Sequence, residues 1–345
     1  MTRPRPRHLV PRTLLSAIAA VLPFAAAGAL DTGREDVTAF IGSMVEKHGF
    51  DAAALGSLFA QVEARPSIVT AISRPAEKTM PWHEYRARFI TERRIARGVE
   101  TAHAQAEALQ KAAAIGVPAQ VLLAIVGVET FYGEITGKHR VIDALATLAF
   151  DYPPRSPFFR SELEQYLLMA REESLDPLAP LGSYAGAMGI PQFMPTSFRA
   201  YAVDGNADGH RDLWGQWSDV FASVANYLKL HGWRVGEPVM VPADVSGAEL
   251  DGLEFGRLAL ADTVQSLQQR GIRFETILPP DSPAVLIELA GKSGPEYRVG
   301  FTNFYAITRY NRSQLYASAV NDLAEAIAAS VQPPALPRPT TPFGE

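Results

Sequence analysis

Hydrophobic residues recur with helical spacing along most of the chain up to Gly236. Apolar positions three and four residues apart place one apolar face on each segment, while Gly and Pro mark where segments end. The pattern predicts two short helices within 35–64 separated at His48-Gly49, and single helices over 84–115, 119–129, 156–173 and 218–232.

The pattern changes after Gly236. Three short segments rich in β-branched residues and separated by Gly, Pro, Asp and Ser predict strands with tight turns: 237–245, 284–291 and 296–301. Residues 311–331 again predict a helix, and the Pro-rich stretch 332–345 is expected to form a disordered tail. The sequence therefore predicts a mainly α fold (α+β) with a small β domain near its C-terminal end.

Residues 1–29 resemble a secretory signal peptide. Four arginines precede the apolar run "LLSAIAAVLPFAAA", and Ala25–Ala27 offer small residues for cleavage near Ala27–Ala29. A membrane anchor is the alternative, which Pro23 inside the run disfavours. The sequence therefore predicts export to the periplasm.

Charge and cysteine content exclude several function classes. Without the four leader arginines, 28 of the 32 Lys and Arg residues remain against 37 Asp and Glu, a net charge of about −9. With no basic run to follow phosphates, nucleic acid is not an expected partner. The chain has no cysteine, which excludes disulfides, thiol catalysis and a thioether lipid anchor. No oligomerisation signal is visible, and a monomer is expected.

Glu129 is the candidate catalytic residue. It ends the apolar run "VPAQVLLAIVGVE", where an unpaired carboxylate is costly to bury. A carboxylic acid kept protonated near neutral pH is what a general acid needs. The alternative is that Glu129 simply faces solvent at a helix end.

The segment 182–199, "GSYAGAMGIPQFMPTSFR", predicts a ligand-binding loop. Its glycines let the backbone approach a ligand, and Ser183 and Gln192 supply hydrogen bonds. A tightly packed loop without a ligand is the alternative. Several nearby aromatic residues would line a sugar cleft or belong to the core.

Residues 204–219, "DGNADGHRDLWGQWSD", resemble an EF-hand loop. Oxygen-bearing side chains alternate at Asp204, Asn206 and Asp208, and the His210 carbonyl follows at position seven. Position twelve is Gly215 rather than Glu, so Asp219 would have to close a longer loop. The pattern predicts a structural Ca²⁺ site that Na⁺ could also occupy, and a metal-free turn is the alternative.

Seven motifs in order resemble the lytic murein transglycosylase B family between Asp36 and Val331. They are "GVETFYG", "VIDALATLAFDYPPR", "FFRSELEQYLLMAREE", "GSYAGAMGIPQFMPTSF", "YAVDGNADGHRDLW", "SVANYLKLHGW" and "NFYAITRYNRSQLYASAV". The resemblance implies a helical domain over 30–116 completed by 303–331, a lysozyme-like core over 117–235 and a small β domain over 236–302.

The resemblance also implies an activity. Family members cleave the β-1,4 bond between N-acetylmuramic acid and N-acetylglucosamine in peptidoglycan without adding water, and leave a 1,6-anhydro end. Glu129 would act first as acid and then as base, with no catalytic cofactor. The substrate-binding residues carried over are Ser183, Gln192, Tyr227, Tyr310, Asn311, Tyr316, Arg155 and, most weakly, Tyr85.

Two positions depart from the family pattern. Pro154-Arg155 replaces two successive arginines, and the metal loop is one residue longer before Asp219. The rival functions are a hydrolytic muramidase, which needs a second carboxylate such as Asp143 or Asp151, and a non-catalytic peptidoglycan-binding protein. Glycan strands are the expected partner, with cell-wall synthases and divisome proteins as further candidates.

Overall fold

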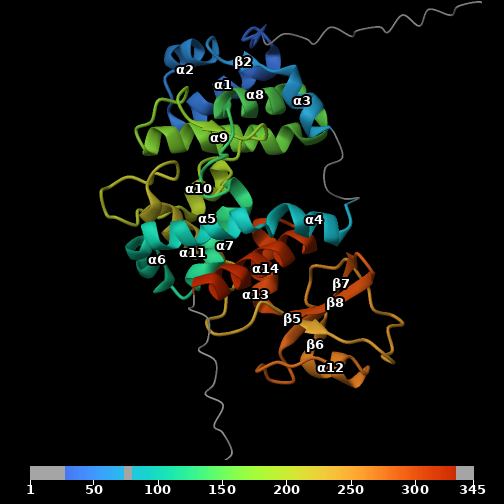
Figure 1. The fold of residues 1–345 in the computed structure, drawn as a ribbon. Coiled ribbons are helices and arrows are strands. Elements are labelled where there is room, and N and C mark those ends of the chain that lie inside the picture. Colours follow the sequence, from blue (N-terminus) through green and yellow to red (C-terminus); the bar gives the residue numbers. More distant parts are fainter. Residues whose placement is uncertain (1–27, 74–79, 332–345) are drawn as a thin grey trace, which may run out of the picture.

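The computed structural model describes residues 28–73 and 80–331 of the 345-residue chain (Figure 1). These residues form fourteen α-helices and eight strands. Of the predicted leader 1–29, residues 1–27 lie outside the described residues, as does the tail 332–345. Of the helices described, none combines the length and the hydropathy needed to cross a bilayer.

The helices nearest the N-terminus pack on two helices from the middle of the chain (Figure 1). These are α1 (Glu35–His48), α2 (Ala52–Phe59) and α3 (Pro66–Ile72), together with α8 (Val141–Asp151) and α9 (Ser156–Glu172). The predicted break after His48 is confirmed, because Gly49 ends α1 in the left-handed conformation with φ 65°. Arg65 joins the two parts through an ion pair of 3.2 Å with the buried Asp143.

The single helix predicted over 84–115 is wrong. The segment forms three helices, α4 (Trp82–Phe89), α5 (Glu92–Ala104) and α6 (Ala106–Ala113). The first break occurs because the Thr91 side chain accepts a hydrogen bond from the Arg94 N–H at 3.2 Å and thereby begins a new helix. The second lies at Gln105, whose φ and ψ of −118° and 28° leave the helical range.

Helix α7 (Ala119–Thr130) is the centre of the molecule. Nine of its twelve residues are buried, which explains its lack of a polar face. It packs against α5, α6, α11 (Trp217–Leu230) and α14 (Gln314–Val331). The proposed boundary at residues 116 and 117 is therefore crossed by packing contacts. The same core includes α10 (Pro195–Tyr201) and α13 (Thr302–Tyr310).

The three predicted strands correspond to β5, β7 and β8, and together with β6, which was not predicted, they form a four-stranded antiparallel sheet in the order β5-β8-β7-β6. Its members are β5 (Met240–Ala243), β6 (Asp262–Thr263), β7 (Pro283–Gly291) and β8 (Gly294–Gly300), with α12 (Val264–Gln269) packed beside β6 and β7. The sheet has a small core of its own and lies beside α4 and α14 (Figure 1). The remaining short elements are β1 (Gly28–Ala29), β2 (Glu63–Ala64), β3 (His139–Arg140), the 3-10 turn Pro153–Arg155 and β4 (Leu181–Gly182).

Candidate active site

Glu129 lies in the last turn of α7, half-buried, and is held from the far end of the chain. The hydroxyl of Tyr316, on α14, donates a hydrogen bond of 2.6 Å to Glu129 Oε1. Tyr316 is only 2% exposed, so this donor is fixed in place by the core. Burial, and then the negative charge of Glu129, raise the pKa of Tyr316 well above its ordinary value, which keeps the phenol protonated and able to donate.

A row of aromatic rings continues from Tyr316. Tyr310 stacks nearly parallel to it with ring centroids 6.4 Å apart, and Tyr227 meets Tyr310 edge-on at 4.8 Å. The Tyr310 hydroxyl donates to the Pro191 carbonyl at 2.6 Å, and the Tyr227 hydroxyl donates to the Arg309 carbonyl at 2.6 Å. These two bonds attach the 182–199 loop and α11 to α13. Three tyrosines predicted from two separate motifs thus form one continuous wall.

The chain reverses direction directly after Glu129 through a left-handed turn. Phe131 and Tyr132 have φ of 52° and 58°, and Gly133 follows at 86°. Two consecutive non-glycine residues in this region are strained, and such strain gathers at functional sites. The Thr130 hydroxyl supports the turn because it donates to the Ile190 carbonyl at 2.9 Å and accepts from the Gly133 N–H at 3.1 Å. This turn was not predicted from the sequence, where Gly133 is its only local signal.

Tyr132 is fixed in this unusual conformation by close packing. An added Cβ would lie 2.5 Å from its hydroxyl at Gly98 on α5 and 2.7 Å at Gly127 on α7. Only glycine therefore fits at these two positions. The Tyr132 hydroxyl is buried and finds no hydrogen-bond partner within residues 28–73 and 80–331. The shape of this contact therefore holds the Tyr132 ring, and the hydrogen bonds of Thr130 hold the backbone of the turn.

Ser183 and Gln192 line one pocket of 500 Å³ together with residues 134–139. Gln192 has φ 53°, and its amide donates to the carbonyls of Thr136 at 3.1 Å and Gly189 at 2.8 Å. The Ser183 hydroxyl accepts from the N–H groups of Ala185 and Ala187, at 3.2 and 3.0 Å. The glycine-rich loop thus brings two predicted ligand-binding residues to the same cavity.

The other predicted substrate contacts differ in position. Asn311 is exposed just after α13, and Tyr85 is buried on α4, where its ring packs against those of Trp82 and Phe89. Arg155 is exposed beside α9, and its guanidinium lies over the rings of Phe158 and Phe159, 4.4 and 5.1 Å from their centroids.

The nearby carboxylates along the chain are paired with arginines. Glu134 forms ion pairs of 3.1 Å with Arg97 and 3.5 Å with Arg93 on α5. The two carboxylates considered for a hydrolytic mechanism are also paired: Asp143 with Arg140 at 2.8 Å and Asp151 with Arg34 at 2.5 Å. These arrangements are structural, because each carboxylate neutralises a cation that joins two segments.

The loop 204–219 is closed by its own side chains. Asp204 accepts from the Gly209 N–H at 2.8 Å, and Asp208 accepts from the His210 N–H at 2.9 Å. Asp219 is fully buried, and its oxygens accept from the N–H groups of Gly205 and Asp212 at 2.9 and 2.8 Å. Within the described ranges no three His, Asp or Glu side chains converge on a metal position. The all-oxygen donor set of Asp204, Asn206 and Asp208 nevertheless fits a hard cation.

Comparison with known proteins identifies the family. Residues 32–325 match the Transglycosylase SLT domain. The chain belongs to this family. Membrane-bound lytic murein transglycosylase B of Escherichia coli is 41% identical over 299 residues, which cover 84% of this chain and 81% of that protein.

Solved structures of transglycosylases have the same fold as this chain. Lytic transglycosylase SltB1 from Pseudomonas aeruginosa has a TM-score of 0.81 and 47% identity over 87% of this chain and 99% of its own. The Escherichia coli lytic transglycosylase Slt35, in complex with calcium, has a TM-score of 0.79 and 39% identity over 88% of this chain and 96% of its own. The mainly α, lysozyme-like fold expected from the sequence is confirmed for this transglycosylase.

Proposed function

We propose that this protein is a peptidoglycan lytic transglycosylase of cell-wall turnover, which cleaves the bond from N-acetylmuramic acid to N-acetylglucosamine and leaves a 1,6-anhydro end. One observation carries the proposal: the hydroxyl of the buried Tyr316 is fixed on Glu129 Oε1 at the end of the apolar helix α7. A carboxylate held in this way suits a reaction in which the same group gives and then takes a proton.

Glu129 first protonates the glycosidic oxygen that leaves. The oxygen of the substrate's own 2-acetamido group stabilises the positive charge that develops at C1. Glu129, now a carboxylate, then accepts the proton of the muramic 6-hydroxyl as that oxygen attacks C1. Tyr316 donates to Glu129 Oε1 and so stabilises the ionised form between the two steps.

The remaining residues bind the sugar. Ser183 and Gln192 are proposed to contact it in their shared pocket, and Asn311 to reach it from the exposed end of α13. Tyr227 and Tyr310 contribute ring faces, because their hydroxyls are already bonded to backbone carbonyls. Tyr85 and Arg155 are proposed as peripheral contacts.

The loop 204–219 is proposed to bind Ca²⁺ as a structural ion. Asp204, Asn206, Asp208 and the His210 carbonyl would supply oxygens, with Asp219 as the fifth ligand. Hydrogen bonds from the Asn206 amide and the His210 N–H lower the pKa of Asp208, which keeps this carboxylate ionised. When bound, the ion would neutralise the acidic loop and play no part in the proton transfers.

The proposed place of action is the periplasm, where this chain would meet glycan strands as a monomer after removal of residues 1–29. Cell-wall synthases and divisome proteins are proposed protein partners. The substrate carries peptide stems: the related SltB3 of Pseudomonas aeruginosa was solved with a NAG-NAM-pentapeptide ligand.

Digestion of purified peptidoglycan tests the function. The mature protein and a Glu129→Gln variant are incubated with glycan strands, and the released muropeptides are weighed by mass spectrometry. We expect products one water lighter than their hydrolysed counterparts, and none from the variant. Hydrated reducing ends would instead establish a muramidase, and no product from the wild type would leave only a binding function.

A further inference from the structure

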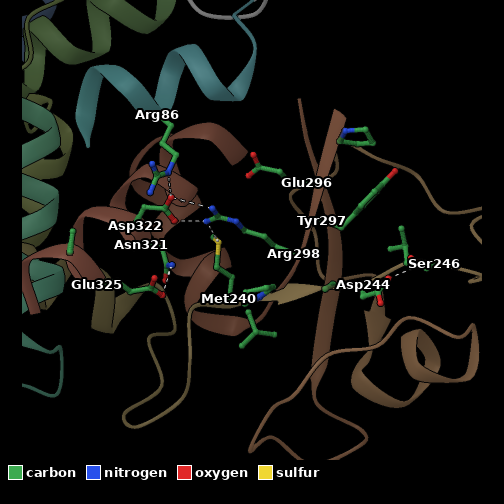
Figure 2. A pocket seen from close by; sticks show the side chains of 16 residues that line it. Arg86, Met240, Asp244, Ser246, Glu296, Tyr297, Arg298, Asn321, Asp322 and Glu325 are labelled. Carbon is green, nitrogen blue, oxygen red and sulfur yellow. Dashed lines mark hydrogen bonds and ion pairs between the residues drawn. The ribbon is translucent and has the colours of Figure 1, made fainter. Parts of the chain in front are cut away.

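A second cleft lies between the sheet and the helical body (Figure 2), and it shares no lining residue with the pocket of Ser183 and Gln192. It has a volume of 880 Å³, with walls from α4 and α14 on one side and β5 and β8 on the other. None of the residues assigned above to catalysis, sugar binding or calcium binding lines it. Its size is that of a binding site for a small ligand.

Two arginines share one carboxylate in this cleft. Arg298 bonds both oxygens of Asp322, at 2.5 and 3.1 Å, and Arg86 Nε donates to Asp322 Oδ2 at 2.7 Å (Figure 2). Asp322 is 7% exposed, so the group is largely desolvated. Taken alone, this group of two arginines and one carboxylate carries one positive charge, which lies on the half-exposed Arg86 side chain, while Glu296 and Glu325 make other parts of the lining acidic.

Arg86 is the member of the cluster that can bind a further anion. Its side chain is 47% exposed, whereas that of Arg298 is 16% exposed. The bond to Asp322 uses only Nε, and no other acceptor in the described part of the chain takes up the two terminal nitrogens. These nitrogens form a planar pair of donors, which matches a carboxylate.

The rest of the lining is acidic and apolar. Glu325 lies beside the cluster and accepts from the Asn321 amide at 2.9 Å, and Glu296 lies on the opposite wall (Figure 2). Pro242 occupies the edge strand β5 and lacks an N–H, which disfavours pairing of a new strand along this edge. The cleft thus suits a short peptide that carries a carboxylate for Arg86 and an amine for the glutamates.

We propose that this cleft binds the peptide stem of peptidoglycan, an inference that rests on the function proposed above. A stem bears free carboxylates and an amine, which complement Arg86 and the two glutamates. The distance is compatible with a connected substrate. Asp322 follows Tyr316 by six residues on α14, which separates the two side chains by about 9 Å along the helix axis and about 120° around it. An extended stem of five residues spans up to about 18 Å.

The test compares two substrates and two variants. Glycan strands with their stems, and the same strands stripped of stems by an amidase, are digested by the wild type, Arg86→Gln and Arg88→Gln. Arg88 is an exposed arginine on the same helix outside the cleft, so its variant loses the same charge. We expect Arg86→Gln to lower kcat/KM about tenfold on stem-bearing strands, mainly through KM, and Arg88→Gln to match the wild type on both substrates.

The outcomes separate this inference from the proposed function. An equal loss by Arg86→Gln on both substrates would mean that the arginine only supports the structure, and no loss on stem-bearing strands would mean that the cleft binds no stem. Either result overturns the inference while the enzyme remains a transglycosylase. Failure of the wild type to produce anhydro ends from either substrate would instead overturn the proposed function.

Discussion

Removal of the Tyr316 hydroxyl is the most direct test of how Glu129 is controlled. In Tyr316→Phe the ring remains in its buried place, and only the donor 2.6 Å from Glu129 Oε1 is lost. A hydrogen bond to a charged group contributes about 1.5–3 kcal/mol. The bond strengthens as the carboxylate becomes ionised, so the Tyr316→Phe variant loses most of this free energy from the stabilisation of the transition state. Because about 1.4 kcal/mol corresponds to a factor of ten, kcat should fall between about tenfold and a hundredfold with little change in KM.

The assay is the initial rate of anhydromuropeptide release over a range of substrate concentrations, with thermal unfolding measured in parallel. Tyr166→Phe is the matched control, since Tyr166 is also buried and its hydroxyl donates to the Pro177 carbonyl at 2.7 Å. This control should lose about 1 kcal/mol of stability and retain the wild-type kcat. A Tyr316→Phe enzyme with wild-type kcat, or one changed only in KM, would refute the reasoning.

Three further predictions concern stability, each measured by thermal unfolding. Gly98→Ala should destabilise the protein by about 1–3 kcal/mol, because its Cβ meets the Tyr132 hydroxyl at 2.5 Å, and adding Tyr132→Phe should recover part of the loss. Burial raises the pKa of Glu162, so the native state loses stability as pH rises through that pKa. Glu162→Gln should therefore have the same unfolding temperature as the wild type at pH 4 and a higher one at pH 7.5. Equal unfolding temperatures of the two proteins at both pH values would contradict this. Calcium at a hundredfold excess over its Kd should add about 2.7 kcal/mol, an effect that Asp208→Ala should abolish and that magnesium at the same concentration should not reproduce.

Local features of the sequence predicted most helices and strands correctly. The end of α1 at Gly49 and the start of α7 after Pro118 follow from backbone preferences of single residues. Local pattern failed over 82–113, where the charged and alanine-rich sequence is compatible with one continuous helix. The capping bond of Thr91 and the packing of α4, α5 and α6 on different neighbours decided that region.

The candidate site likewise combines residues that the sequence predicts with contacts that only the tertiary structure determines. The sequence by itself predicted Glu129 as the candidate, since a carboxylate at the end of an apolar run is conspicuous, and the family motifs pointed to the tyrosines. Only the tertiary structure placed Tyr316 against Glu129, 187 residues away, and Arg86 against Asp322, 236 residues away. Helical periodicity reports which face of a segment is buried, but it carries no information on the partner. That choice is made by the packing of distant segments into one core, which brought the Tyr316 hydroxyl to Glu129 and the Arg86 guanidinium to Asp322.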